Sequence, residues 1–142
     1  MKPDKLSMCG VQVDLSYIDM PAFVFAARED HIVPWRGAFA GATNLSGETQ
    51  FVLGASGHIA GVVNPASKNK RSYWQGEPLD GASPQPERWL QHAKEVEGSW
   101  WPHWSAWLRE FSGRMIPART TLGNATFRPI EPAPGRYVKE KN

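Results

Sequence analysis

Two residues with complementary chemistry, Asp30 and His58, stand in matching positions in this sequence. Each follows an apolar run, AFVFAA at residues 22–27 and FVLGA at residues 51–55. A neutral imidazole can take up a proton near neutral pH. A carboxylate on the other ring nitrogen fixes the tautomer and stabilises the imidazolium that forms. The two residues therefore predict an acid and a base that act together.

The surrounding sequence predicts the elements that position this pair. Uniformly apolar runs of this length are typical of strands buried on both faces of a parallel sheet. Between the runs, residues 34–45 place large apolar side chains at helical spacing, and Pro34 suits the first turn of a helix. We therefore predict a strand, a helix and a second, parallel strand.

In such a unit Asp30 and His58 should meet at one edge of the sheet. The loops after neighbouring parallel strands share the carboxyl edge, so both side chains are expected in one crevice. The order acid then base is the second half of the α/β-hydrolase order of nucleophile, acid and base. Taken singly, an Asp in a loop often only caps a turn, and a His is often a surface residue.

The chain as a whole is expected to have four segments. Residues 1–65 contain the strand–helix–strand unit, and residues 66–86, rich in Pro, Gly, Ser and charge, predict a long surface loop. Residues 87–113 predict two helices separated at Gly98. Residues 114–142 contain several prolines and predict an extended arm. Two parallel strands leave edges and faces uncovered, so the sheet is expected to be incomplete.

Composition excludes several classes of function. The 16 Lys and Arg nearly balance the 14 Asp and Glu, which gives no electrostatic case for nucleic acid or an anionic membrane. A single cysteine excludes an internal disulfide, and neither Cys pairs nor an HExxH spacing indicates a zinc site. No apolar run has the length of a signal peptide or a spanning helix. We expect a soluble, cytoplasmic protein without a metal or cofactor.

Longer blocks of this sequence closely resemble, in content and order, the C-terminal part of class I polyhydroxyalkanoate synthases. The resemblance covers nearly the whole chain. The blocks are REDHIVPW (28–35), FVLGASGHIAGV (51–62), NP (64–65), KNKR (68–71), GSWWP (98–102) and IEPAPGRYVK (130–139).

This resemblance implies a fold and an activity. The fold would be the C-terminal portion of an α/β-hydrolase fold, its last parallel strands with flanking helices. The activity would be an acyltransferase that polymerises (R)-3-hydroxyacyl-CoA, chiefly 3-hydroxybutyryl-CoA, into a polyester and releases CoA. The CoA thioester is a substrate, and no cofactor is implied. By analogy His58 deprotonates a cysteine thiol, while Asp30 either orients His58 or helps activate the hydroxyl of the incoming unit.

The resemblance also implies partners. They are the N-terminal remainder of the synthase, the growing polyester chain, a second copy in a homodimer, and the surface of polyester granules in the cytoplasm. The KNKR block would then attract the phosphates of CoA or form an ordinary solvated face. His31, beside the acid, would line the site or remain a solvated loop residue.

The nucleophile of that family, a cysteine in a Gly-x-Cys-x-Gly elbow, is missing from this sequence. Cys9 precedes Asp30 and His58 in the right order, but neither flanking glycine is in place. Residues 10–21 are also too few for the strand, turn and helix of an elbow. We therefore expect Cys9 to be a small buried hydrophobe, and the nucleophile and oxyanion hole to lie outside the chain.

Two other functions fit the same residues. An esterase, lipase or thioesterase of the same fold would use the same acid and base with water as acceptor. A non-enzymatic module could instead dock on granules or on the rest of the synthase through Trp100, Trp101, Trp104 and Trp107, although tryptophans at helical spacing more often pack a core.

The missing nucleophile makes a direct prediction. The purified chain should release no CoA thiol from 3-hydroxybutyryl-CoA in a colorimetric thiol assay, because an acid and a base alone cannot form the acyl-enzyme. Turnover by the isolated chain would contradict this expectation.

Overall fold

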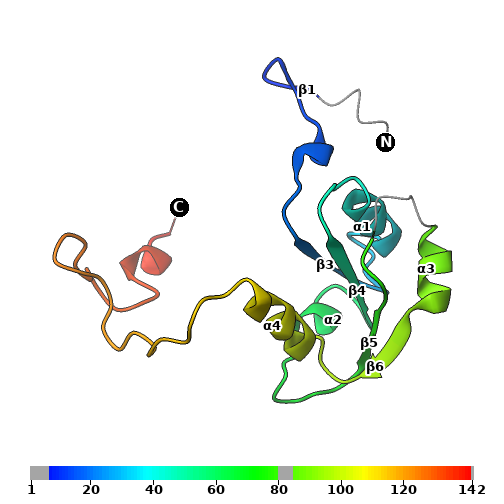
Figure 1. The fold of residues 1–142 in the computed structure, drawn as a ribbon. Helices are drawn as coiled ribbons and strands as arrows, with labels where there is room; N and C mark the ends of the chain where they lie inside the picture. The colour runs from blue at the N-terminus through cyan, green and yellow to red at the C-terminus, as the bar shows by residue number, and fades with distance from the viewer. Residues whose placement is uncertain (1–6, 80–84, 142) are drawn as a thin grey trace. The chain divides into compact units, whose positions relative to one another are not determined.

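The computed structural model describes residues 7–79 and 85–141 of the chain. It contains two compact units, the first ending at Phe111 and the second beginning at Ser112. The first unit combines a sheet with helices and is an α/β structure (Figure 1). In the described part of the chain, no helix has the length and apolar character needed to cross a bilayer.

A four-stranded mixed sheet forms the centre of the first unit. Its strand order is β3-β4-β5-β6. Strands β3 (Ala22–Ala27) and β4 (Thr49–Gly54) run parallel, with Ala27 opposite Gly54, which confirms the predicted parallel pair. Strands β5 (Ser72–Gln75) and β6 (Lys94–Glu97) extend the sheet by antiparallel pairing.

One face of the sheet packs against helices α1 (Trp35–Ala42) and α3 (Pro86–His92) (Figure 1). Phe39 of α1 is 1% exposed, and its ring lies 4.9 Å from that of Phe51 and 5.7 Å from that of Trp89. This aromatic contact fixes both helices on the sheet.

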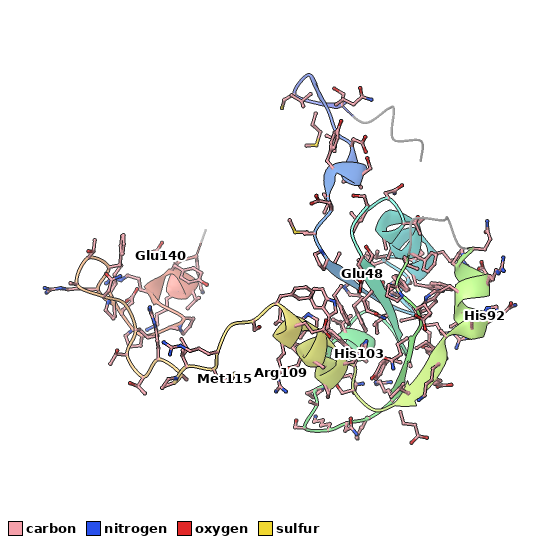
Figure 2. All side chains as sticks on the ribbon, in the orientation of Figure 1. Glu48, His92, His103, Arg109, Met115 and Glu140 are labelled. Carbon is pink, nitrogen blue, oxygen red and sulfur yellow. The ribbon has the colours of Figure 1, made fainter. Side chains whose placement is uncertain are left out.

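The opposite face packs against helix α4 (Trp101–Glu110) and the residue before it, Trp100. Val52 and Tyr73 are buried there. His103 of α4, labelled in Figure 2, stacks on Tyr73. Side chains alternate between faces along a strand, so Phe51 and Val52 of β4 enter different cores. Burial on both sides explains why β4 is apolar throughout.

The prediction of a surface loop at residues 66–86 is wrong, because β5 lies inside it and buries Tyr73. The prediction of two helices at residues 87–113 is confirmed in number by α3 and α4, but the first helix is shorter than its apolar pattern suggested. Helix α3 ends at His92, and β6 follows, pairing Val96 with Tyr73. The sheet edge presented by β5 satisfies backbone groups that a longer helix would have bonded internally, so tertiary pairing overrides the helical pattern.

Shorter elements complete the first unit. The N-terminal part forms a hairpin of β1 (Ser7–Met8) and β2 (Val11–Gln12), then a 3₁₀ turn, η2 (Leu15–Tyr17). Helix α2 (Ala60–Val63) is a single turn directly after the β4 loop.

The second unit, described to Lys141, has one regular element, the 3₁₀ helix η3 (Arg136–Lys139). Its large apolar side chains are exposed, as seen for Met115 in Figure 2. The others are Ile116, Leu122, Phe127, Ile130, Tyr137 and Val138. Among residues 112–141 no side chain is buried.

Removing the ring at the centre of the first core should cost most of the stability of the fold. We expect Phe39→Ala to lower the free energy of unfolding by about 3–5 kcal/mol, through lost burial and the cavity left behind. Leu122→Ala, at a position 82% exposed, should change it by less than about 0.5 kcal/mol. Urea denaturation followed by tryptophan fluorescence measures both, with Phe39→Leu as a milder variant. Equal losses at the two positions would contradict this account of the core.

Candidate active site

Asp30 lies in the tight turn that follows β3. Its backbone N–H donates to the Ala27 carbonyl at 3.2 Å. Its Oδ1 accepts from the backbone N–H groups of Ile32 at 2.8 Å and Val33 at 2.9 Å. The carboxylate thereby closes its own loop, and its side chain is only 8% exposed. Asp30 therefore also caps its turn, which is the usual structural role of an Asp in a loop.

His58 lies in the loop after β4, and backbone bonds tie this loop to that of Asp30. The Arg28 N–H donates to the Gly54 carbonyl at 2.8 Å, and the Glu29 N–H to the Ser56 carbonyl at 3.0 Å. Ser56 has a φ of 75°, a left-handed conformation that turns the chain away from the sheet edge. The parallel pairing of β3 and β4 thus continues into the two loops.

The structure brings Asp30 and His58 together. His58 Nδ1 lies 2.8 Å from Asp30 Oδ2, the oxygen that does not hold the loop. This confirms the prediction that the two side chains share the carboxyl edge of the sheet. The His58 side chain is 45% exposed, and no group among the described residues bonds its Nε2. The ring is therefore fixed at one nitrogen and open at the other.

Hydrogen bonds keep the Asp30 carboxylate ionised. The Val33 N–H contributes most, followed by the His58 side chain, and together with Ile32 they lower the pKa of Asp30 from 3.8 to about 2, against desolvation that raises it. At neutral pH the carboxylate accepts from the His58 ring, so Nδ1–H is the donor and Nε2 is the basic nitrogen. The arrangement can accept a proton from a group placed at Nε2.

Close packing behind His58 requires a glycine in helix α2. A Cβ on Gly61 would lie 2.6 Å from the Ala55 carbonyl oxygen and 3.2 Å from the Ala27 side chain. Helix α2 can therefore lie directly against the ends of β3 and β4. This is a close approach, since Gly61 itself is an ordinary helical residue.

Other candidates from the sequence lie differently. Cys9 is exposed in the turn of the β1–β2 hairpin, so the expectation that it is buried is wrong. A turn between two strands is also not the strand–turn–helix of a nucleophile elbow. His31 and the KNKR block at residues 68–71 are exposed. Trp100 is buried, as a core tryptophan should be, whereas Trp101 remains 38% exposed.

Two further features bear on ligands. Among residues 7–79 and 85–141, no group of three His, Cys, Asp or Glu side chains is arranged to hold a metal ion. A hollow of about 810 Å³ is lined by Gln50, Trp89 and His92, among others. Gln50 lies at the start of β4, away from its carboxyl end, so this hollow is separate from the Asp30 and His58 pair.

No pattern in the sequence places Ser99, Trp100 and Trp101 near His58. Their side chains bond the carbonyls at the end of helix α2, across 35 to 39 residues of sequence. No periodicity spans that distance. The only signal was their presence in the GSWWP block of the family resemblance.

These observations define the class of site: a hydrogen-bonded Asp–His pair at the carboxyl edge of two parallel strands in an α/β structure. No family model matches the chain. It is 54% identical over 98% of its length to the poly(3-hydroxyalkanoate) polymerase subunit PhaC of Cupriavidus necator. It is 43% identical over 97% to the subunit of that name from Rhizobium etli, and 42% identical over 96% to poly(3-hydroxyalkanoate) polymerase 2 of Ectopseudomonas oleovorans.

The chain spans only 23%, 21% and 24% of the lengths of these relatives. It belongs to the poly(3-hydroxyalkanoate) polymerase family, as the C-terminal part of such a protein. The resemblance stated from the sequence blocks is thereby confirmed.

The hydrogen bonds of Asp30 predict its titration. The Asp30 carboxyl carbon, followed by NMR, should titrate near pH 2. In His58→Ala the midpoint should rise but stay below 3.8, because the Val33 and Ile32 N–H groups remain.

The sign of the effect on stability follows from the same shift. The folded-state pKa of Asp30 lies below the unfolded one, so its stabilisation is present at neutral pH and is lost as the pH falls from about 4 to about 2. A midpoint near 3.8 in the unsubstituted chain would mean that the loop bonds do not form in solution.

Proposed function

We propose that this chain supplies the acid and the base of an acyltransferase active site that polymerises (R)-3-hydroxyacyl-CoA into a polyester and releases CoA. The observation that carries the proposal is the bond from His58 Nδ1 to Asp30, which leaves Nε2 open. The names of the relatives, poly(3-hydroxyalkanoate) polymerases, supply the reaction class. The thioester is a substrate, and the proposal includes no metal or cofactor.

In the proposed reaction His58 serves a cysteine outside this chain. Nε2 takes the thiol proton, and the thiolate attacks the thioester carbonyl of the hydroxyacyl-CoA. The C–S bond to CoA then breaks, and the CoA thiolate leaves with the proton held by His58. The hydroxyl of another hydroxyacyl-CoA next attacks the acyl-enzyme carbonyl, so that an ester bond forms as the C–S bond to the cysteine breaks, and the hydroxyl proton passes through His58 to the cysteine sulfur. The lengthened chain, now a thioester of the incoming CoA, acylates the cysteine again and that CoA is released.

We propose that Asp30 orients His58. Oδ1 is bonded to two backbone N–H groups and Oδ2 to the imidazole. A pKa lowered to about 2 also makes this carboxylate a poor proton acceptor for a hydroxyl. Both facts favour the role of Asp30 as a fixed anion that stabilises the imidazolium. They argue against direct activation of the hydroxyl of the incoming unit by Asp30.

We further propose that the whole protein has an α/β-hydrolase fold that continues the sheet beyond β3. Among the described residues β3 pairs only with β4, so its other edge is open. A strand and nucleophile elbow from the N-terminal remainder would add there and bring the cysteine to the carboxyl edge. Ile32 and Ile59, 61% and 72% exposed beside the Asp–His pair, would be covered in the same step.

The product suggests where the protein works. A growing polyester held as a thioester keeps the enzyme at its own insoluble product. We therefore propose a cytoplasmic location at the granule surface, with a homodimer as the assembly. The exposed apolar side chains of the second unit are available for such contacts.

The full-length polymerase polypeptide tests the role of His58. We expect His58→Ala to lower kcat for CoA release by about 10²–10⁴-fold, the usual contribution of a general base. His31→Ala, an exposed neighbour of the site, is the matched control. Polymer as product supports the synthase, whereas free 3-hydroxy acid would indicate a hydrolase.

The role of Asp30 can be tested in the same assay through Asp30→Asn. An orienting carboxylate predicts that the first, acylating release of CoA slows as much as later elongation, since both steps use His58. If the first release is normal and only elongation slows, Asp30 activates the hydroxyl instead.

A further inference from the structure

Helix α2, which begins two residues after His58, cannot hold itself in place. It has four residues, far fewer than an isolated helix needs for stability. Its N-cap, Ile59, offers no side-chain hydrogen bond. Its backbone hydrogen bonds nevertheless engage the residues on both sides of His58. The Gly61 N–H donates to the Gly57 carbonyl and the Val63 N–H to the Ile59 carbonyl, both at 2.9 Å. The position of His58 therefore depends on this turn.

The end of α2 is held by Ser99, Trp100 and the first residue of α4, Trp101. Carbonyls at a helix C-terminus have no partner within the helix. Here each of three consecutive carbonyls accepts a side-chain hydrogen. Ser99 Oγ donates to the Asn64 carbonyl at 2.6 Å, Trp100 Nε1 to Val62 at 3.0 Å, and Trp101 Nε1 to Val63 at 3.1 Å and more weakly to Val62 at 3.3 Å. We call Ser99, Trp100 and Trp101 the carbonyl clamp.

The carbonyl clamp is itself fixed by the core of the sheet. Trp100 is 9% exposed, and its ring stacks on Phe25 of β3 at 4.2 Å and 24°. Ser99 is 4% exposed, and its backbone N–H donates to Asn69 Oδ1 at 2.9 Å. An indole N–H can only donate a hydrogen bond, so it needs an acceptor. For Trp100 and Trp101 the carbonyls at the end of α2 are that acceptor.

We propose that Ser99, Trp100 and Trp101 are positioning residues that set the location of His58 through helix α2. The sheet carries Asp30 directly, because its loop continues from β3 and its carboxylate closes that loop. The loop that carries His58 is tied to the Asp30 loop by the Glu29 N–H and runs on into helix α2. The carbonyl clamp ties the turn back to β3 through Trp100. It thereby holds the imidazole at the 2.8 Å distance from Asp30 and fixes the direction of Nε2. This inference rests on the proposed role of His58 as the base.

Substitutions that remove one donor at a time test the carbonyl clamp in the full-length polymerase polypeptide. Trp101→Phe removes the indole N–H from a half-exposed ring, and Ser99→Ala removes the hydroxyl. Each should lower kcat for CoA release by about 10-fold or more, with KM changed by less than about twofold, because misplacing a catalytic group can cost up to about 10²-fold.

Two variants serve as controls. Ser99→Thr keeps the hydroxyl and should restore kcat to within about twofold of the unsubstituted enzyme. Trp107→Phe changes a tryptophan of the same helix that packs on Phe23 and Phe111, and should leave kcat unchanged. Among the described residues no acceptor bonds the Trp107 indole.

Hydrogen exchange supplies the second readout. Exchange at the amides of Gly61 and Val63 should be faster in Trp101→Phe and Ser99→Ala than in Trp107→Phe. Unchanged kcat in both donor variants overturns the inference, whether or not exchange is faster, and so does a rise in KM at constant kcat. Turnover that survives His58→Ala would instead refute the proposed function. Loss of turnover in His58→Ala with normal donor variants refutes only the positioning role.

Discussion

The hydrogen bond between His58 Nδ1 and Asp30 Oδ2 is the interaction on which the chemistry of this chain depends. It exists because β3 and β4 are parallel and end together, with Ala27 opposite Gly54. The pairing then continues into the loops, where Arg28 and Glu29 donate to the backbone of the β4 loop. A shift of register by one residue would turn the strand faces over and separate the two side chains.

The core on both faces of the sheet gives this pair a rigid base. Phe39, Phe51 and Trp89 fix one face, and Val52, Tyr73 and Trp100 fix the other. Trp100 has a second role, since its indole reaches a carbonyl of helix α2. The acid is thus attached to the sheet by its own loop, and the base by a helical turn that other residues must hold.

Sequence reasoning succeeded where the pattern is local or where the chemistry follows from chain order. The apolar runs gave β3 and β4, and the spacing between Trp35 and Ala42 gave α1, because burial on two faces or one stripe leaves a period in the sequence. It failed at β5 and β6, which lie in segments of four residues whose local pattern suggests a loop and a helix. Such short strands form because a neighbouring edge accepts their backbone. It also failed at Cys9, since a hairpin turn places the thiol outside the core.

By itself the sequence determined the chemical types of the acid and the base, their place after two buried strands, and the family to which the chain belongs. The acid, the base and their strands follow from residue identity and from patterns within about 30 residues, and the family follows from sequence blocks spread between residues 28 and 139. Only the tertiary structure decided that one Asp30 oxygen closes its loop while the other meets His58, and that Ser99, Trp100 and Trp101 hold helix α2. Hydrogen-bond geometry between residues far apart in the chain is set by how the elements pack against one another. Contacts of this kind have no characteristic spacing in the sequence from which they could be predicted.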